Sequence, residues 1–281
     1  MIVARTRSEL AGAQQALRRD GARFGLVPTM GYLHEGHLSL VDLVAARTDV
    51  VAVSVFVNPL QFGPSEDLAT YPRDEARDLA MLEARGAHLV FLPPLEEMYP
   101  EGPPAVRVDP GPLGHRLCGR YRPGHFSGVL TVVAKLLGLF RPDVAVFGRK
   151  DFQQEALIRR MVSDLDMGTE IVAAPIVRED DGLAMSSRNS YLDVEERVQA
   201  AVIHAGLQAA LARFREGVRE SEMLVGAFAE VVAAAPLLDV QYAEVVDRWS
   251  LESVEVADER AVMAVAVFCG KTRLIDNVEL G

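Results

Sequence analysis

Apolar residues follow two alternating spacings through the first two thirds of the chain. Continuous apolar runs, typical of strands buried in a sheet, occupy residues 24–27, 50–57, 87–92, 144–147, 171–174 and, more briefly, 176–178. Between them apolar residues recur at helical spacing, in residues 8–20, 38–45, 74–85 and 126–140. Ser8 is expected to begin the first helix, and Pro28 to end the first strand. This alternation predicts strand, helix, strand units with right-handed crossovers, and therefore a parallel sheet.

The pattern changes after Tyr191. Two alanine-rich amphipathic helices are predicted at residues 193–214 and 221–235, followed by strands at 240–246, 261–268 and 272–278. We find no catalytic constellation there. The chain is therefore predicted to be an α/β protein, with a Rossmann-like doubly wound parallel sheet in residues 1–176 and a smaller α+β C-terminal domain, acting as a lid, in residues 177–281.

Composition narrows the class of protein. The 281 residues are 49% hydrophobic and 25% charged, as in an ordinary globular enzyme, and the net charge of -11 disfavours nonspecific binding to nucleic acid or anionic membrane. Local positive charge can still bind an anionic substrate. Cys118 and Cys269 lie far apart, which favours reduced thiols over a disulfide or a metal site. With no signal pattern and no membrane-length apolar run, we expect a cytoplasmic protein.

The loop after the first predicted strand, residues 28–37, carries two histidines three positions apart. Because helical spacing begins at Leu38, Gly36 is expected near a helix N-terminus. Free backbone N–H groups and the helix dipole attract anions there, and glycine lets a phosphate approach the main chain. The imidazoles of His34 and His37 can donate hydrogen bonds to phosphate oxygens as charge moves onto a leaving group. The pattern indicates attack on a nucleotide phosphate.

Two other interpretations of this loop compete. His34, Glu35 and His37 are residue types that bind zinc, but the helical zinc motif needs one more residue between its histidines, so that both share a face. Alternatively, the histidines are surface polar groups at the start of a structural helix. The rest of the chain has to decide among the three.

Two further loops follow predicted strands, at the sheet edge where open α/β sheets bind ligands. Asn58 and Gln61 come after the run at 50–57 and are expected to face the same crevice as the histidines, although a turn capped by Asn58 is an equal alternative. Gly148 and Lys150 come after the run at 144–147, where glycine permits close approach and lysine neutralises phosphate. There, Asp151 as a simple helix cap and Lys150 as a surface charge form the competing interpretation.

Two polar segments add less specific signals. Residues 120–126 are basic within an acidic chain, which suits an anionic ligand, but a solvated loop explains them as well. Residues 180–189 place Ser186, Ser187 and Arg188 in a turn that can close over phosphates. Neither segment alone identifies a site.

Taken together, these motifs resemble the pantothenate synthetase family, a member of the His-x-Gly-His nucleotidylyltransferase superfamily that also contains the class I aminoacyl-tRNA synthetases. They occur in order over nearly the whole chain, at residues 28–37, 58–62, 122–126, 148–154 and 185–188. The resemblance implies an AMP-forming ligase that joins pantoate and β-alanine. The pantoate carboxylate would attack the α-phosphorus of ATP, giving an acyl-adenylate, from which the β-alanine amine displaces AMP. The resemblance further implies Mg²⁺ and a homodimer, with no nucleic-acid or membrane partner.

The resemblance also implies residue roles. The catalytic residues implied are His37, His34 and Lys150. ATP is expected to contact Met30, Gly31, Tyr32, Leu33, His34, Glu35, Gly36, His37, Gly148, Arg149, Lys150, Asp151, Val177, Met185, Ser186, Ser187 and Arg188. The substrate-binding residues implied are Gln61, Gln154 and Asn58, with β-alanine near Gln61. No protein ligand is named for Mg²⁺.

Two residues depart from the family pattern. Arg149 stands where the family usually has glutamate, so it either points away from the nucleotide or adds to phosphate binding. Cys118 also stands where glutamate is more usual, which puts a polar contact there in doubt.

Two other functions are weighed against the ligase. A related adenylyltransferase in which a phosphate attacks ATP would need arginine or lysine to bind that phosphate. The chain instead offers the neutral amides Gln61 and Gln154, which suit a hydroxy acid. A noncatalytic ATP sensor would have no need of His37 or Lys150, and both are present.

Overall fold

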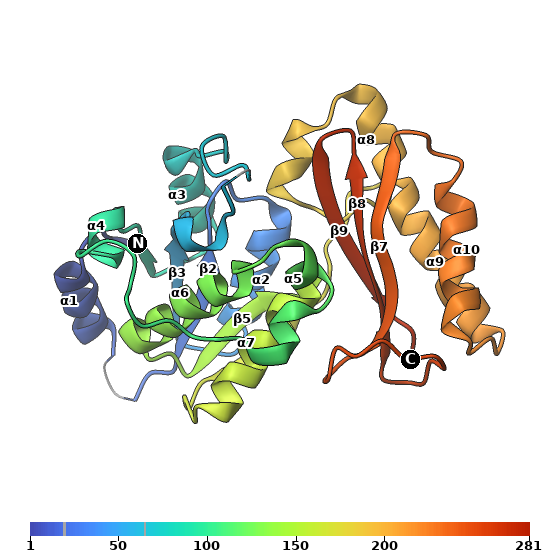
Figure 1. Ribbon diagram of the computed structural model, residues 1–281. Coiled ribbons are helices and arrows are strands. Elements are labelled where there is room, and N and C mark those ends of the chain that lie inside the picture. Colours follow the sequence, from blue (N-terminus) through green and yellow to red (C-terminus); the bar gives the residue numbers. More distant parts are fainter. Residues whose placement is uncertain (19–20, 65) are drawn as a thin grey trace. The chain divides into compact units, whose positions relative to one another are not determined.

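The computed structural model describes residues 1–18, 21–64 and 66–281, so the last two residues of the helix predicted at 8–20 lie outside the described residues. The chain divides into two compact units (Figure 1). The first unit comprises Met1–Gly114, Arg122–Arg149 and Leu157–Pro175, and the second comprises His115–Tyr121, Lys150–Ala156 and Ile176–Gly281. The single domain boundary predicted between residues 176 and 177 stays a prediction.

The first unit contains a six-stranded parallel sheet in the order β1-β4-β3-β2-β5-β6. Its strands are β1 (Ile2–Ala4), β2 (Phe24–Thr29), β3 (Val50–Val55), β4 (Leu89–Phe91), β5 (Val144–Gly148) and β6 (Glu170–Ala174). Every residue of β3 is buried, as its continuous apolar run predicts for a central parallel strand. The predicted Rossmann-like parallel sheet is thus confirmed.

Helices alternate with these strands. They are α1 (Arg7–Leu17), α2 (Glu35–Ala45), α3 (Glu75–Ala84), α4 (Leu95–Met98), α6 (His125–Phe140) and α7 (Phe152–Asp164), with single-turn helices η1 (Pro59–Gln61), η2 (Gly111–His115) and η3 (Arg149–Asp151). The apolar face of α2 packs Leu38, Val41 and Val44 against the sheet core. Burial of that face is what holds the start of α2 in place over the sheet.

Strand order fixes where a ligand can bind. From β2 the chain runs outward through β3 and β4, and later returns to the other side of β2 as β5 and β6. Gly25 and Leu26 of β2 pair with Val144 and Ala145 of β5. Crossovers therefore change direction between β2 and β5, and open α/β sheets bind ligands beyond the carboxyl ends of the strands at such a switch point.

The second unit is built on an antiparallel sheet of β7 (Leu238–Asp247), β8 (Ala261–Cys269) and β9 (Thr272–Glu279). Its helices are α5 (Cys118–Tyr121), η4 (Ser187–Tyr191), α8 (Val194–Ala200), α9 (Val202–Arg215) and α10 (Ser221–Val232). Leu207 of α9, Phe228 of α10 and Val265 of β8 share its apolar core. This confirms a smaller α+β fold at the C-terminal end.

Several predicted boundaries were wrong. Thr6, not Ser8, caps α1, because its side chain accepts the N–H of Glu9 while Glu9 reaches back to the Thr6 N–H. Pro28 does not end its strand: β2 continues to Thr29, where pairing with β3 persists. The predicted helix at 193–214 is two helices, α8 and α9, divided at Ala201.

One predicted strand is absent from the sheet, and one strand of the sheet was not predicted. Residues 176–178 do not join the sheet, because Arg178 instead forms an isolated bridge with Ala184 in a local turn. The three-residue edge strand β1 is too short to show a period in the sequence. Among the helices of the described residues, none has the length and apolarity that crossing a membrane requires.

Candidate active site

Helix α2 begins three residues earlier than its apolar spacing suggests. His34 is its N-cap, with extended backbone at φ -139° and ψ 174°, and Gly36 and His37 lie in the first turn. Both histidines therefore stand at the exposed N–H end of a helix that follows β2, at the switch point of the sheet. The predicted placement of Gly36 beside a helix N-terminus is confirmed.

The imidazoles of His34 and His37 lie next to each other, and a hydrogen bond from the His34 backbone determines which nitrogen of His37 carries the proton. Their ring centroids are 4.1 Å apart, and the backbone N–H of His34 donates to Nδ1 of His37 at 3.4 Å. A ring nitrogen that accepts an N–H carries no proton, so the neutral His37 ring has its proton on Nε2. His37 is thereby set up as an Nε2–H donor.

The loop between β2 and α2 adopts a conformation that needs glycine. Gly31 has φ +82°, and a Cβ there would lie 2.9 Å from Cγ1 of Val55. Tyr32 follows with φ 51°, a left-handed conformation unusual for an aromatic residue. The Gly31 N–H donates to Oγ1 of Thr29 at 3.2 Å, which tightens the turn.

Asp78 of α3 holds this loop from the side. Its Oδ2 accepts the N–H of Tyr32 and its Oδ1 accepts the N–H of Leu33, each at 2.7 Å. The residue is 2% exposed, and burial raises the pKa of its carboxyl above the ordinary 3.8, against the lowering effect of the Leu33 and Tyr32 N–H groups. Sequence reasoning missed Asp78. The available signal was an acid four residues before the buried Leu82, on the inner face of its helix.

Glu35 points its charge elsewhere. Its carboxylate pairs with Arg85, which also pairs with Asp42, and the Glu35 side chain is largely exposed. Glu35 lies in the first turn of α2, next to the histidines, but only its backbone is part of the histidine loop.

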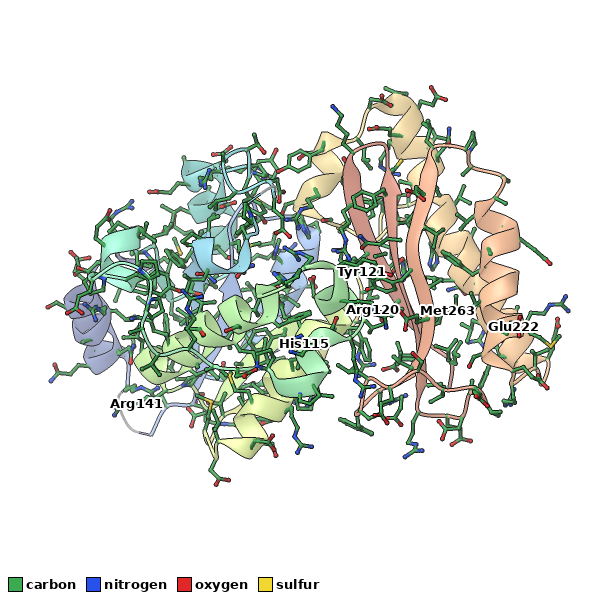
Figure 2. The ribbon with its side chains drawn as sticks, in the orientation of Figure 1. His115, Arg120, Tyr121, Arg141, Glu222 and Met263 are labelled. Atoms are coloured by element: carbon green, nitrogen blue, oxygen red, sulfur yellow. The ribbon has the colours of Figure 1, made fainter. Side chains whose placement is uncertain are left out.

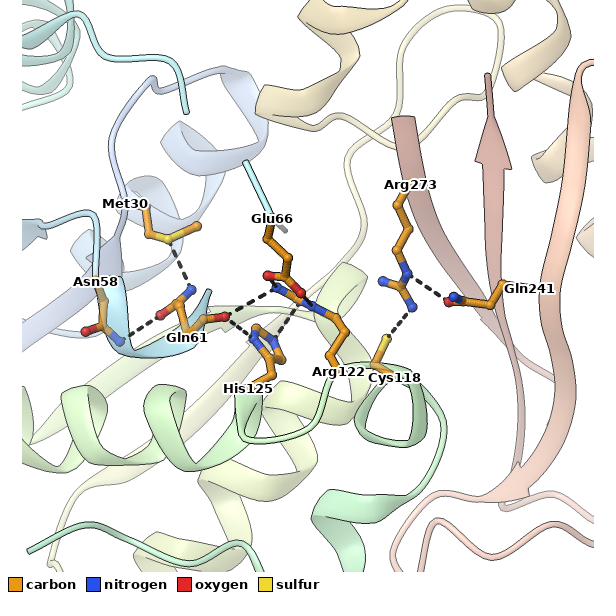
Figure 3. A network of polar contacts seen from close by, with 9 residues as sticks. All are labelled: Met30, Asn58, Gln61, Glu66, Cys118, Arg122, His125, Gln241 and Arg273. Carbon is orange, nitrogen blue, oxygen red and sulfur yellow. Dashed lines mark hydrogen bonds and ion pairs between the residues drawn. The ribbon is translucent and has the colours of Figure 1, made fainter. Parts of the chain in front are cut away.

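Gln61, at the end of η1, is held by partners on both sides (Figure 3). Its Oε1 accepts Nδ2 of Asn58 at 3.1 Å, and its Nε2 donates to Sδ of Met30 at 3.1 Å. Gln61 and the histidine loop are thus brought together through Met30, as their positions after adjacent strands predict. The side chain is 9% exposed.

Asn58 is fully engaged with protein partners. Its Nδ2 also donates to the Gly128 carbonyl at 3.2 Å, while its Oδ1 accepts the Tyr99 hydroxyl at 2.9 Å and the Leu60 N–H at 3.4 Å. Burial raises the pKa of the Tyr99 hydroxyl to about 12, which keeps it a proton donor. These bonds assign Asn58 to holding Gln61, whereas its predicted contact with pantoate stays a prediction.

Arg122 and His125, from the basic segment predicted at 120–126, bind the backbone carbonyl of Gln61. Arg122 donates to Nε2 of His125 at 2.9 Å, and since guanidinium can only donate, His125 must offer its Nδ1–H to the Gln61 carbonyl, at 2.7 Å (Figure 3). Arg122 also pairs with Glu66 through two hydrogen bonds. Burial alone would raise the pKa of Glu66, but the Arg122 hydrogen bond and charge outweigh it and lower the pKa.

Gly148 closes β5 beside the switch point. A Cβ there would meet nothing nearer than Cδ2 of Leu40, at 4.0 Å. The space over Gly148 is therefore uncrowded by protein, as the prediction of close phosphate approach requires. Arg149 begins the single-turn helix η3.

The remaining candidate residues belong to the second unit. The Lys150 carbonyl accepts Nδ2 of Asn277 at 3.1 Å. Gln154 lies on the first turn of α7 next to the buried Gln153, whose Nε2 donates to the Arg116 carbonyl at 2.8 Å. The segment that begins with Lys150 and Asp151 is thus anchored to its own unit.

The turn that was predicted to close over phosphates belongs to a short antiparallel hairpin-like segment, residues 177–185. Met185 donates its N–H to the Val177 carbonyl at 3.0 Å, and Glu179 donates to the Leu183 carbonyl at 2.8 Å. Beyond it, Ser186 caps η4 by accepting the Arg188 N–H, and Ser187 is buried. Val177 and Met185 are thereby neighbours, which places the predicted adenine and phosphate residues of this turn side by side.

Cys118 has polar partners, although the resemblance to the family leads us to expect glutamate at this position. Its Sγ lies 3.1 Å from the Tyr242 hydroxyl. The same Sγ accepts a guanidinium N–H of Arg273 at 3.3 Å (Figure 3). The adjacent Arg120 and Tyr121 of α5 also face β7, where Arg120 pairs with Glu244 and the Tyr121 ring stacks on Tyr242 (Figure 2). Cys118 therefore serves to dock α5 on β7 within the second unit, and both it and Cys269 are free thiols.

The candidate residues fall into two groups. The first unit contains Met30–His37, Asn58, Gln61, Gly148 and Arg149, and the second contains Lys150, Asp151, Gln154, Val177 and Met185–Arg188.

Comparison with known proteins identifies the family. The sequence model described as Pantoate-beta-alanine ligase matches residues 2–279. The chain is 50% identical to the pantothenate synthetase of Thermoanaerobacter sp. (strain X514), covering 100% of this chain and 99% of the relative. It is 51% identical to that of Myxococcus xanthus (strain DK1622), covering 99% and 96%.

Solved structures agree. Pantothenate synthetase from Thermus thermophilus superposes with a TM-score of 0.93 at 44% identity, covering 100% of this chain and 99% of that one. A pantoate-beta-alanine ligase from Francisella tularensis, complexed with "Beta-gamma ATP and Beta-alanine", gives a TM-score of 0.81 at 32% identity, covering 100% and 98%. These matches confirm the resemblance seen in the sequence. The chain belongs to the pantoate-β-alanine ligase family, the pantothenate synthetases.

Proposed function

We propose that this chain joins pantoate to β-alanine at the expense of ATP, through a pantoyl-adenylate, and that the two histidines at the start of α2 serve the adenylation step. The ligase activity is that of the family to which the chain belongs. The observation that carries the residue assignment is the His34 N–H donating to Nδ1 of His37, which leaves Nε2–H as the donor group at a helix N-terminus.

In the first step a pantoate carboxylate oxygen attacks the α-phosphorus of ATP. The new bond joins that oxygen to phosphorus, and the bond from the α-phosphorus to the bridging oxygen breaks, so pyrophosphate leaves with the electron pair. Negative charge grows on the bridging oxygen and on the phosphate chain. His37, assisted by His34 and Lys150, donates hydrogen bonds to these oxygens, where preorganised donors lower the barrier.

The proposed ATP site draws on both groups of candidate residues, those of the first unit and those of the second. The histidine loop is proposed to contact the phosphates through Met30, Gly31, Tyr32, Leu33, Glu35 and Gly36, with Glu35 contributing backbone only. Gly148 and Arg149 bind nucleotide, Asp151 reaches the ribose, and Val177 contacts the adenine through its backbone. Met185, Ser186, Ser187 and Arg188 close over the triphosphate. Support comes from the open space above Gly148 and from the Met185 to Val177 hydrogen bond.

Pantoate is proposed to bind Gln61 and Gln154, with Asn58 holding Gln61. Neutral amides suit a ligand that offers hydroxyl groups and a carboxylate. In the second step the β-alanine amine attacks the acyl carbon of the adenylate near Gln61. A carbon-nitrogen bond forms, the carbon-oxygen bond to AMP breaks, and the amine loses a proton to the surroundings. The products are pantothenate and AMP.

We further propose that Mg²⁺ arrives with ATP and that the working form is a cytoplasmic homodimer. Among residues 1–18, 21–64 and 66–281, no group of three or more His, Cys, Asp and Glu gathers to hold a metal ion. Mg²⁺ is commonly held by substrate phosphates and water, so we name no protein ligand for it. Mg²⁺ would neutralise charge on the phosphate chain.

The test is product analysis. ATP and Mg²⁺ are supplied with pantoate alone and then with β-alanine, and pyrophosphate, AMP and pantothenate are followed together. AMP and pantothenate in equal amounts, formed only with both substrates, support the proposal. ATP binding without turnover would identify a sensor, and turnover only with a phosphorylated acceptor would identify a related adenylyltransferase. Either result overturns it.

A further inference from the structure

The last strand, β9, carries two consecutive buried polar residues. Its side chains alternate in burial from Thr272 as far as Asp276, after which Asn277 is buried as well. Asp276 and Asn277 are each 4% exposed. A buried carboxylate next to a buried amide costs stability unless specific partners compensate, so their partners indicate what the pair does.

Asp276 holds the turn that contains Val177 and Met185. Its Oδ2 accepts NH1 of Arg178 at 2.6 Å and its Oδ1 accepts NH2 at 3.0 Å, a bidentate pair. Arg178 NH1 also donates to the Gly182 carbonyl, at 3.0 Å, so one guanidinium fixes both sides of the turn. Gly182 has φ +93°, and a Cβ there would run into the ring of His204, which packs the turn onto α9.

Asn277 holds the segment that begins with Lys150, which is proposed to bind nucleotide and lies in the same unit. Its Nδ2 donates to the Lys150 carbonyl at 3.1 Å, and its own N–H donates to Oδ1 of Asp276 at 2.8 Å. Successive side chains of a strand point to opposite faces of the sheet. Two adjacent residues of β9 therefore contact the two segments from opposite faces of the sheet: Asn277 contacts the Lys150 segment and Asp276 contacts the Arg178 turn.

We infer that Asp276 and Asn277 are positioning residues for ATP: they set the spacing between the Lys150 segment and the turn of residues 177–188. This inference rests on the proposed function, which assigns both segments to the nucleotide. Neither residue touches the reacting atoms. Their effect on the reaction passes through the Lys150 backbone and the Arg178 guanidinium, so it falls on ATP rather than on pantoate.

The experiment compares isosteric variants. Asp276→Asn leaves one acceptor oxygen for a guanidinium that needs two, and Asn277→Asp turns the donor to the Lys150 carbonyl into a repelling oxygen. Asp276→Asn loses a charge-assisted hydrogen bond, and Asn277→Asp replaces a neutral hydrogen bond with repulsion between oxygens. Each is expected to raise the KM for ATP about tenfold and to leave the KM for pantoate within about twofold. The matched control is Asp239→Asn on β7, an exposed carboxylate without a hydrogen bond or ion pair in the described part of the chain. It should change neither constant.

Arg178→Lys is the milder variant should either substitution prevent folding. It keeps the charge and loses the bidentate geometry, and it is expected to raise the KM for ATP severalfold. ATP and pantoate affinities of all variants are also measured by calorimetry, with thermal unfolding in parallel. Equal loss of both affinities, or lowered thermal stability with unchanged ATP affinity, would overturn the inference. Failure of the proposed function is seen separately, as absence of pantothenate from the unaltered protein.

Discussion

The carboxylate of Asp78, on α3, accepts the backbone N–H of Tyr32 at 2.7 Å, across 46 residues of sequence. With the matching bond to the next N–H, it fixes the left-handed pair of residues that turns the chain from β2 into α2. The direction in which the histidines leave the sheet therefore depends on a side chain outside their own loop.

We predict that Asp78→Asn lowers turnover about tenfold or more. Asparagine offers one acceptor oxygen to two buried N–H groups, and leaving one unsatisfied costs about 1–3 kcal/mol, which the loop can escape only by moving. Steady-state kinetics against ATP and pantoate measure the loss. Asp74→Asn is the control, because Asp74 caps the same helix and asparagine caps equally well. Full activity of Asp78→Asn would show that the loop holds its shape alone.

His37→Ala is expected to reduce turnover by about a hundredfold or more, the scale for losing one positioned donor to a developing charge. The variant removes the Nε2–H whose orientation the His34 N–H enforces. Single-turnover formation of the adenylate is the measurement. His115→Ala, an exposed histidine at the end of η2, provides the comparison and should retain activity. Unchanged turnover in folded His37→Ala would rule out its catalytic role.

Gln61→Ala is expected to weaken pantoate binding far more than ATP binding, because its amide is proposed to bind pantoate, whereas its hydrogen bond to the histidine loop goes to the sulfur of Met30. Calorimetric titration with each ligand separately gives both affinities. Equal weakening of the two would mean that Gln61 only shapes the loop.

Tyr99→Phe tests the support behind Gln61. It removes the hydroxyl that donates to Oδ1 of Asn58 at 2.9 Å and leaves the ring in place. Loss of one buried hydrogen bond should cost about 1 kcal/mol of stability and raise the KM for pantoate severalfold, with the KM for ATP nearly unchanged. Chemical denaturation and kinetics report the two effects. A stability loss without any change in the pantoate constant would separate Tyr99 from substrate binding.

Glu66→Gln is expected to change the pH dependence of stability. Because Arg122 holds the pKa of Glu66 below its ordinary 4.5, the folded state binds this proton less tightly than the unfolded state. The pair therefore stabilises the fold above pH 4.5, and its contribution is lost as pH falls through the lowered pKa. At neutral pH the variant should be less stable by about 1 kcal/mol, the scale of a partly exposed ion pair. Urea unfolding at neutral and acidic pH should show the difference between the two proteins shrinking on acidification.

Local pattern was enough to predict strands β2 to β6 and, to within three residues, the start of the helix that carries His34 and His37, because strand burial and helical spacing depend on neighbouring residues. Asp78, Asp276 and Asn277 escaped prediction, because each acts on backbone or charge far away in the sequence. Arg178 shows the converse. Its apolar neighbours suggested a strand, while its real partners are the carboxylate of Asp276 and the Gly182 carbonyl, which bend the segment into a turn.

The hydrogen bond from Gln61 to the sulfur of Met30 has a consequence for affinity. Thioether sulfur is a poor acceptor, so the amide N–H is aimed and ordered but only weakly satisfied. Much of the rotational freedom of Gln61, about 1.5–2 kcal/mol for such a side chain, is already lost before any substrate arrives. A carboxylate or hydroxyl that takes the place of the sulfur gains a stronger bond without that entropic cost. If Gln61 binds pantoate as proposed, Met30 occupies the place of a substrate oxygen and keeps the Gln61 amide oriented to bind it.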